Sequence, residues 1–464
     1  MSPMGQSLGP AGAAASSSFL HTASGSRFTT RWDGNALRQT IERGGLAADH
    51  PVAFAIGSGN HARGFVIRVD KRLYQSPIAF YPRKGSWDVA PGYEANSNPD
   101  FNRPVTTECL LCHSGTSGAI PGAITCERCH GSSELHLRKP SRATILNPSR
   151  LAPAERDSVC EQCHLSGEGR ILHPEKDFAD FQPGQRLEDV FSTFVQDRPR
   201  DELKVVSHVE QLALSACAQN SNGRLWCGSC HTAHGEPVSF RDRCLQCHAQ
   251  TLSAEHLKRA GECSTCHMPK RAVVDGSHTA FTDHRIQRNK ATEVTAGKSS
   301  VLKAWRALPD AAAGQRNLGL AYIAVGEREG SAEQINRGYR LLSEVYPRYP
   351  KDSEVLSALG MVLFLKDEFS SAVRLLQTAI ANRPGHAPLY EKLAVVHRAA
   401  GRRAEASAAL EKALALDPAR ESAYHMQADL NTTPEQRKQA LERYLLVMPQ
   451  SLLAREAIRT SAGR

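Results

Sequence analysis

Six copies of one short motif are the residues best suited to do chemistry. Each copy has two cysteines separated by two residues and followed at once by a histidine. This spacing is typical of covalent haem attachment, in which the two thiols bind the haem and the histidine ligates its iron. The copies are Cys109-Leu-Leu-Cys112-His113, Cys126-Glu-Arg-Cys129-His130, Cys160-Glu-Gln-Cys163-His164, Cys227-Gly-Ser-Cys230-His231, Cys244-Leu-Gln-Cys247-His248 and Cys263-Ser-Thr-Cys266-His267.

Zinc sites and disulfides are the competing interpretations of these cysteines. Zinc ribbons and fingers also use Cys-x-x-Cys pairs, but they need no histidine directly after each pair. A disulfide framework gives no reason for the histidines either. The sequence therefore predicts six haem c groups attached through the motif cysteines. The proximal iron ligands would be His113, His130, His164, His231, His248 and His267.

A distal ligand for each iron would have to come from outside the motifs. Met268 is the only methionine near them, and directly after His267 it is badly placed to reach the far face of that haem. Histidines are abundant, which predicts bis-histidine, low-potential haems that carry electrons. The distal candidates are His61, His136, His208, His234, His278 and His284, with His21, His50, His173 and His256 as weaker ones.

The segment that carries the motifs, residues 105–288, offers too little chain per motif for an ordinary side-chain core. Cys126 follows Cys109 by only 17 positions, and Cys244 follows Cys227 by 17. We therefore expect a haem-packed domain with short helices, little regular structure and closely spaced haems. Residues 27–104 show short alternating apolar and polar runs and an Asp33-Gly34 turn signal, which predict a small β-rich segment packed on that domain.

The C-terminal third has helical spacing and an internal repeat. Pro350, Pro384 and Pro418 recur every 34 residues, which is the tetratricopeptide period, so we expect a repeat array over 312–460. Residues 289–311 are expected to be a linker or a helix leading into the array. Residues 1–26 are expected to be disordered and to follow an incomplete N-terminus. The predicted fold class is thus multidomain and mostly α, ending in an α-solenoid.

Charge and hydropathy narrow the range of partners. The chain has 464 residues and a formal net charge of +9, but haem propionates would offset that charge, so we predict no nucleic-acid partner. No stretch approaches the roughly 18 apolar residues that a membrane-spanning helix needs. We therefore expect no transmembrane segment.

Several of these runs resemble a known family. Cys126 to His136, Asp157 to Gly167, Ser207 to Leu212, Cys263 to Lys270 and His278 to Ile286 resemble bacterial multihaem c-type cytochromes fused to C-terminal tetratricopeptide repeats. The haem part is more remotely similar to the tetrahaem cytochrome and hydroxylamine oxidoreductase group. The resemblance implies a periplasmic or otherwise extracytoplasmic protein, with His136, His234 and the histidines of 278–284 as distal ligands. It leaves open one more haem in the full-length native protein.

Three functions are compatible with this pattern. The first is electron transfer between redox partner proteins, with a protein or peptide docked in the repeat groove. The second is a multihaem oxidoreductase with one open-site haem acting on a small nitrogen or sulfur compound. The third is a scaffold in which the haems are structural. Enough histidines for every iron, and no Cys-x-x-Cys-Lys motif, favour electron transfer, and no catalytic residue is predicted.

Overall fold

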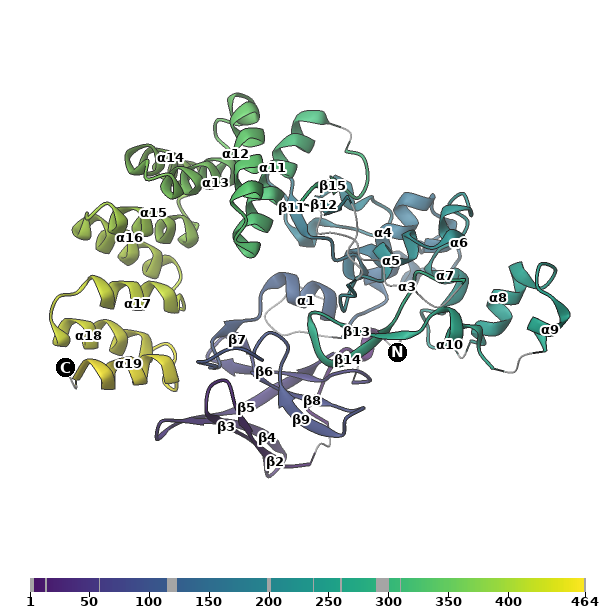
Figure 1. The fold of residues 1–464 in the computed structure, drawn as a ribbon, viewed down its shortest axis with the longest axis horizontal. Helices are drawn as coiled ribbons and strands as arrows, with labels where there is room; N and C mark the ends of the chain where they lie inside the picture. Colours follow the sequence, from purple (N-terminus) through teal and green to yellow (C-terminus); the bar gives the residue numbers. More distant parts are fainter. Residues whose placement is uncertain are drawn as a thin grey trace.

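The computed structural model describes residues 4–12, 15–57, 59–114, 123–197, 202–236, 238–258, 261–288, 300–308 and 310–462. Figure 1 shows a β-rich N-terminal region, a middle region that carries the motifs, and a curved C-terminal array of helices. The β-rich start and the helical solenoid agree with the sequence-based expectation. None of the helices in the described ranges is long and apolar enough to cross a membrane.

The β region is built on an eight-stranded sheet with the order β10-β7-β6-β5-β4-β3-β2, to which β1 adds beside β5. Alternating residues point inward, so Phe28 of β3 and Ile41 of β4 are fully buried. Gly34 has a φ of +56° in the turn that joins these strands. The sheet strands are Leu8–Gly9, Ser17–His21, Ser26–Asp33, Ala36–Arg43, Leu46–Ile56, Gly64–Val69, Arg72–Gln75 and Arg103–Pro104 (β1–β7 and β10), and a separate hairpin joins β8, Ile78–Tyr81, to β9, Ser86–Val89.

The expected disorder of residues 1–26 does not hold for the part of that segment that the structure describes. Strand β2 pairs with β3, and the ring of Phe19 stacks on that of Phe28 with centroids 5.3 Å apart. His21 is held by Ser24 and by the carbonyl of Glu94. The Ala- and Ser-rich composition of this segment does not predict a strand. Strand β2 is held in place by its pairing with β3. Residues 1–3 and 13–14 lie outside the described residues.

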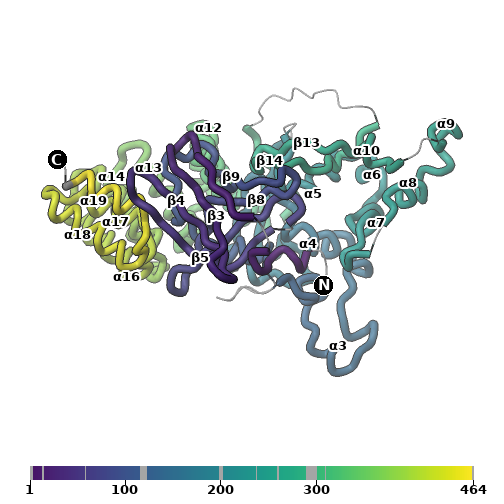
Figure 2. Tube along the Cα trace, turned by 90° about the horizontal axis from the view of Figure 1, so that it is seen from below, coloured from purple at the N-terminus to yellow at the C-terminus, as the bar shows by residue number. Residues whose placement is uncertain are grey.

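The middle region contains ten short helices and two small sheets among its described residues. The sequence did not predict the sheet β11-β12-β15. Its strand β15 lies in the segment 289–311, which was expected to be a linker or a helix. Residues 289–299 and 309 of that segment are not described. In Figure 2, α3 and the α8–α9 pair extend away from the rest of the chain. The helices are Thr107–His113, Glu127–His130, Glu134–Arg138, Pro153–His164, His208–Ala213, Ala216–Gln219, Cys227–Cys230, Phe240–His248, Ala254–Leu257 and Cys263–His267 (α1–α10), and the strands are Gly169–Leu172, Phe191–Gln196, Lys270–Val273, Gly276–Thr282 and Leu302–Ala304 (β11–β15).

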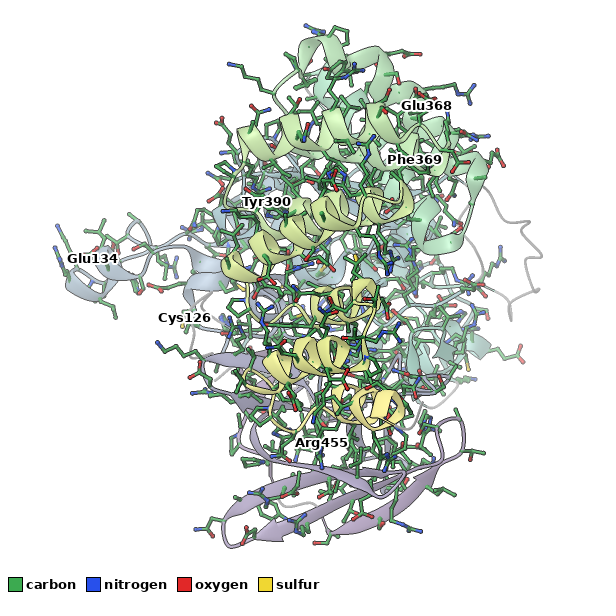
Figure 3. The ribbon with its side chains drawn as sticks, turned by 90° about the vertical axis from the view of Figure 1, so that its left-hand side faces the viewer. Cys126, Glu134, Glu368, Phe369, Tyr390 and Arg455 are labelled. Atoms are coloured by element: carbon green, nitrogen blue, oxygen red, sulfur yellow. The ribbon has the colours of Figure 1, made fainter. Side chains whose placement is uncertain are left out.

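The C-terminal helices stack as antiparallel pairs into an arc, which Figure 3 shows from the side, with Tyr390 on α15 and Arg455 on α19. Polar caps define where the helices begin, as where Asp352 accepts the backbone N–H groups of Glu354 and Val355. The helices are Ala311–Glu329, Ala332–Val345, Ser353–Leu365, Phe369–Asn382, Ala387–Ala399, Arg403–Leu416, Glu421–Leu430, Pro434–Leu445 and Leu452–Ala462 (α11–α19).

Close contact between α11 and α12 depends on glycine. A Cβ atom added at Gly338 would lie 2.6 Å from Cγ1 of Ile323 and 2.7 Å from the carbonyl oxygen of Gly319. We expect Gly338→Ala to lower the free energy of unfolding by about 1–3 kcal/mol, because overpacking outweighs the gain in helix propensity. The matched control is Gly314→Ala on α11, where the nearest atom is 3.4 Å away. Chemical denaturation should show no loss for the control, and equal effects of the two substitutions would contradict this account.

Both ends of the array pack on other parts of the same chain. At the first end, Ala321, Tyr322 and Val325 of α11 form a buried cluster with Phe194 of β12 and Leu302 of β15. At the last end, α19 lies beside the β region. Glu456 of α19 forms an ion pair with Arg43 at 2.8 Å, and Gln450, just before the helix, accepts the backbone N–H of Asp49 at 2.6 Å.

Asp100 caps the start of α19 from across this interface. Its carboxylate accepts the backbone N–H groups of Leu452, at 2.6 Å, and Leu453, at 3.1 Å. Burial raises the pKa of Asp100 to about 6, although these bonds oppose the rise. The folded state therefore binds the proton more tightly than the unfolded state does, so the contribution of Asp100 to stability is greatest below pH 4 and declines up to about pH 6.

We expect Asp100→Asn to remove this pH dependence. The amide oxygen can still accept an N–H group of α19, but the side chain no longer titrates. In the wild-type protein the loss between pH 4 and pH 7 should be on the order of 2–3 kcal/mol at this site. Thermal unfolding of both proteins at a series of pH values is the measurement. Parallel pH curves for the two proteins would contradict the prediction.

Candidate functional site

Each motif lies on a short helix or at its end, which gives it a defined shape. Residues i, i+3 and i+4 share one face of a helix, so two thiols and one imidazole of a motif point to the same side. The motifs fall on α1, α2, α4, α7, α8 and α10. All thirteen cysteines are free thiols with some exposure to solvent.

Helix α4 brings three of the motifs together. Its Cys163 lies beside Cys112 of α1, and its Cys160 lies beside Cys227 of α7. The contact with Cys163 lowers the pKa of Cys112 to about 6, against the effect of burial, and raises that of Cys163. The first, third and fourth motifs are therefore neighbours in space, although 118 residues separate Cys109 from Cys227 in the sequence.

The predicted cofactor, a set of six haem c groups and any further one, is contradicted. Among the described residues no group of three or more His, Cys, Asp or Glu side chains converges where a metal ion could bind. Contacts between thiols of different motifs, such as Cys112 with Cys163, also differ from the separate two-thiol site in each motif that the prediction requires. We therefore correct the prediction and assign neither haem nor a haem-packed core to this chain. The roles of the individual cysteines and histidines stay predictions.

Three motif histidines lie opposite a histidine from elsewhere in the chain. His130 faces His234 with ring centroids 6.0 Å apart and planes 9° from parallel. His231 faces His284 at 6.2 Å. The third pair is His267 with His256, at 6.0 Å. We call these the three histidine pairs.

Backbone groups orient two of these motif histidines. Nδ1 of His130 donates to the carbonyl of Leu146 at 2.7 Å, and Nδ1 of His267 donates to the carbonyl of Gln287 at the same distance. Such a bond fixes the tautomer and leaves Nε2 as the nitrogen with a free lone pair, which is the usual arrangement for a histidine that binds metal. These carbonyl acceptors could not be predicted from the motifs, because they follow the motif histidines by 16 and 20 residues.

A second cluster of rings surrounds His208. His164 lies 5.5 Å from it and His284 4.9 Å, and the ring of Phe281 separates it from His61. Burial, with the neighbouring histidines adding to it, lowers the pKa of His208 to about 3. These imidazoles are therefore neutral at neutral pH, the form in which histidine binds metals. Buried Nδ1 atoms without a hydrogen-bond partner occur in this part of the described chain at His61, His113 and His208.

The six predicted distal histidines are thus not equivalent. His234 and His284 belong to histidine pairs, and His208 and His61 lie in the adjoining ring cluster. His136 is bonded to Thr144 on the projecting α3 segment, at 3.1 Å. Nε2 of His278 lies 2.9 Å from a carboxylate oxygen of Asp88 on β9, and this contact joins the middle region to the β region.

His256, a weak candidate in the sequence, is the partner of His267. It lies on the short helix α9 only 11 residues before that histidine, and Ser253 caps the helix. The short distance in sequence between His256 and the sixth motif could have identified it as a stronger candidate. His173, by contrast, bonds through both ring nitrogens, to the carbonyl of Glu188 and to Asn317, and these bonds indicate a structural role.

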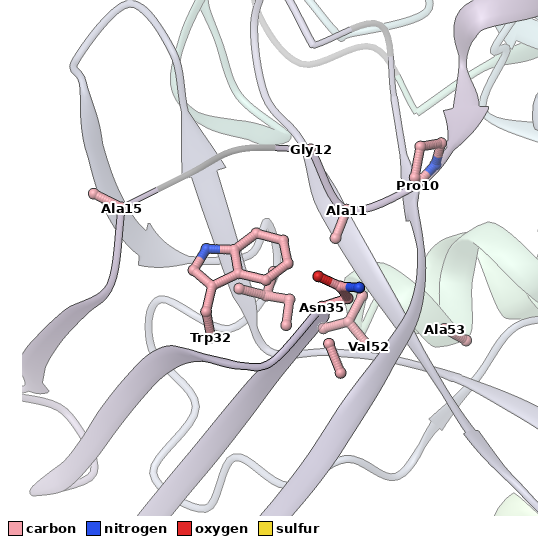
Figure 4. A pocket seen from close by; sticks show the side chains of 10 residues that line it. Pro10, Ala11, Gly12, Ala15, Trp32, Asn35, Val52 and Ala53 are labelled. Carbon is pink, nitrogen blue, oxygen red and sulfur yellow. The ribbon is translucent and has the colours of Figure 1, made fainter.

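A separate cavity of about 680 Å³ lies on the β region beside Trp32 (Figure 4). Its lining includes Pro10, Leu37 and Val52 and contains no cysteine or histidine. This cavity is therefore distinct from the motifs and the histidine pairs, and it offers no titratable group for chemistry.

The helical array can be assigned by comparison with known proteins. Residues 363–430 match the family model for the tetratricopeptide repeat. These residues span the end of α13 to the end of α17, so this part of the chain consists of tetratricopeptide repeats, a class of module that serves in protein interaction. No curated protein sequence matches the chain.

Solved structures of other repeat proteins are similar to this part of the chain. A crystal structure of MamA is 23% identical with a TM-score of 0.25, covering 30% of this chain and 78% of its own. The first tetratricopeptide domain of Spaghetti (RPAP3), bound to an HSP90 peptide, is 20% identical with a TM-score of 0.22, covering 24% and 91%. At these values the similarities say nothing about what this chain binds.

Proposed function

We propose that this chain is an extracytoplasmic electron-transfer protein that docks its redox partners through the tetratricopeptide array. The observation that carries the proposal is the spacing of the three histidine pairs. Electron transfer is the activity that the resemblance of the motif region implies, and the same resemblance favours an extracytoplasmic location. The array supplies the protein-binding module that such a carrier needs.

The spacing of each pair suits one metal between two rings. Metal–imidazole bonds are about 2.0–2.1 Å long and the ring centre lies about 1.1 Å behind the nitrogen, so two imidazoles trans to one metal have centroids roughly 6 Å apart. The pairs measure 6.0, 6.2 and 6.0 Å. Two imidazoles supply only two ligands, so the other positions around such a metal would belong to solvent or to a bound group.

Adjacent rings also give a path between such centres. His284 belongs to one pair and lies 4.9 Å from His208, which in turn lies 5.5 Å from His164 of the third motif. At these distances the histidine rings are direct neighbours, so an electron passing between centres would cross only short gaps. With a metal at each histidine pair, the middle region would combine such centres with short gaps between rings, which is what an electron carrier requires.

The experiment that tests the proposal is metal analysis of the purified full chain, compared with variants. We expect His130→Ala with His234→Ala to lose one equivalent of bound transition metal, because both ligands of one position are gone. His386→Ala, which removes a histidine of the helical array, is the matched control and should lose none. Wild-type protein without bound transition metal would overturn the proposal.

An oxidoreductase that acts on a small nitrogen or sulfur compound is a second candidate. One observation favours it: His113 of the first motif has a buried Nδ1 without a hydrogen-bond partner, and His113 belongs to none of the three histidine pairs. A centre held by His113 alone would keep an open position for a substrate. Perturbation of the protein's absorption spectrum by nitrite or cyanide would support this candidate, and a spectrum unchanged by both would exclude it.

A further inference from the structure

A groove of about 570 Å³ lies where the array meets the edge of the sheet. One wall is the turn between α16 and α17, residues 417–422, and the opposite wall is β7 with the segment from β10 into α1. We call it the array–sheet groove. Its apolar lining includes Leu73, Tyr74, Val105 and Leu110. This volume falls within the range of sites that take a small ligand or a few residues of a peptide.

Two polar contacts join the walls and fix the width of the groove. Asn102 donates to Glu421 at 2.6 Å, and Arg72 lies 3.7 Å from Asp417. Arg420 is held by Glu391, so it does not turn into the groove freely. The groove is therefore a formed feature of the fold and does not depend on a ligand for its shape.

The rim of the groove carries one cation that no described residue neutralises. Lys71 is exposed in the β6–β7 turn, and no described carboxylate lies within ion-pair distance of its ammonium group. The neighbouring Arg72 has only the long contact to Asp417. An acidic side chain placed here would gain a partner without displacing an existing short ion pair.

We propose that the array–sheet groove binds an extended segment of a partner protein in which apolar and acidic residues alternate. An apolar side chain of that segment packs on Leu73, Val105 and Leu110, and an acidic one meets Lys71. Buried apolar anchors with a charged rim are the usual source of affinity and selectivity at such sites. This inference rests on the proposed function and names where the partner docks.

The groove lies beside the first cysteine motif, so a docked partner would be close to the proposed electron path. Leu110 lies between the two cysteines of the first motif, on α1. A segment bound here would therefore hold the partner beside the first motif, at one end of the cluster around α4. Docking by the array and electron entry at α1 would take place at one surface.

The test uses the full chain and a short fluorescein-labelled peptide of alternating leucine and glutamate, with binding read by fluorescence anisotropy. We expect Lys71→Glu to weaken binding about tenfold, because it reverses the charge that the acid meets. Ala419→Trp fills the groove without changing its charge and should abolish binding. Lys351→Glu, at an exposed lysine between α12 and α13, is the matched control and should bind as the wild type does.

Equal binding by the wild type, Lys71→Glu and Ala419→Trp would overturn this inference, as would no binding of the peptide by the wild type. Neither result touches the metal content of the histidine pairs. Metal analysis of the same samples therefore shows separately whether the proposed function stands. Retained binding by the lysine-containing counterpart of the peptide would also contradict the role of Lys71.

Discussion

Replacing Arg316 by alanine will lower the free energy of unfolding by about 3–5 kcal/mol, because it leaves a buried carboxylate without its counter-charge. Arg316 is 1% exposed and lies 2.7 Å from Asp352, whose side chain is 8% exposed. It also donates to the carbonyl of Leu172 on β11 at 2.8 Å. One side chain thus joins the first two repeats to the middle region. Chemical denaturation of the full chain is the measurement.

A matched control and a rescue separate charge from packing in this experiment. Arg337→Ala breaks the exposed pair with Glu333 on α12 and should cost less than about 1 kcal/mol. Adding Asp352→Asn to an Arg316→Met variant removes both charges and keeps the helix cap, so it should recover part of the loss. Equal losses for Arg316→Ala and Arg337→Ala would contradict the account.

Arg306→Ala should have an effect of the same size, and this effect should depend on pH. Arg306 contacts Glu161 at 2.5 Å and Glu188 at 3.4 Å, and both carboxylates are almost fully buried. Trp305 donates to the same Glu161 at 3.3 Å. Without Arg306, Glu161 is buried with no cation and Glu188 keeps only the 3.5 Å contact to Arg186, at a cost of about 3–5 kcal/mol at alkaline pH.

The pH dependence follows from Glu161. Burial raises its pKa to about 7 even though Arg306 opposes the rise. The folded state therefore favours the protonated acid, and its stability declines as the pH rises from about 4.5 through 7. Removing Arg306 raises this pKa further, so the loss relative to wild type should be largest above pH 7 and small near pH 5. Addition of Glu161→Gln should rescue the variant at high pH, and a loss that is the same at both pH values would contradict this reasoning.

The array and the β region were the parts of the fold that the sequence could predict. The prolines at 350, 384 and 418 mark the repeat, and the family match over 363–430 agrees with it. Local rules suffice there, because each helix pair contacts chiefly its neighbours in sequence. The hairpin between β3 and β4 turns at Gly34 and Asn35, one residue from the predicted Asp33-Gly34 position, because a two-residue turn also depends on local sequence.

The candidate site was less predictable because its contacts are long-range. The motif spacing identified which residues matter, but it did not show that Cys163 would meet Cys112 or that His256 would face His267. The haem prediction was based on the cysteine–histidine motif alone. It was contradicted because no cluster of three or more metal-binding side chains occurs in the described ranges. Strand β12, with five of its six residues buried, was missed because its partners β11 and β15 come from distant segments.

A reductive titration of the purified full chain shows whether the middle region carries electrons, as we propose. The absorption and electron-paramagnetic-resonance spectra would be followed while the applied potential is lowered and then raised. We expect reversible uptake of electrons by metal centres, with one centre lost when His130 and His234 are both replaced by alanine. A chain that takes up no electrons, or one whose electron uptake is unchanged in that variant, would contradict the account.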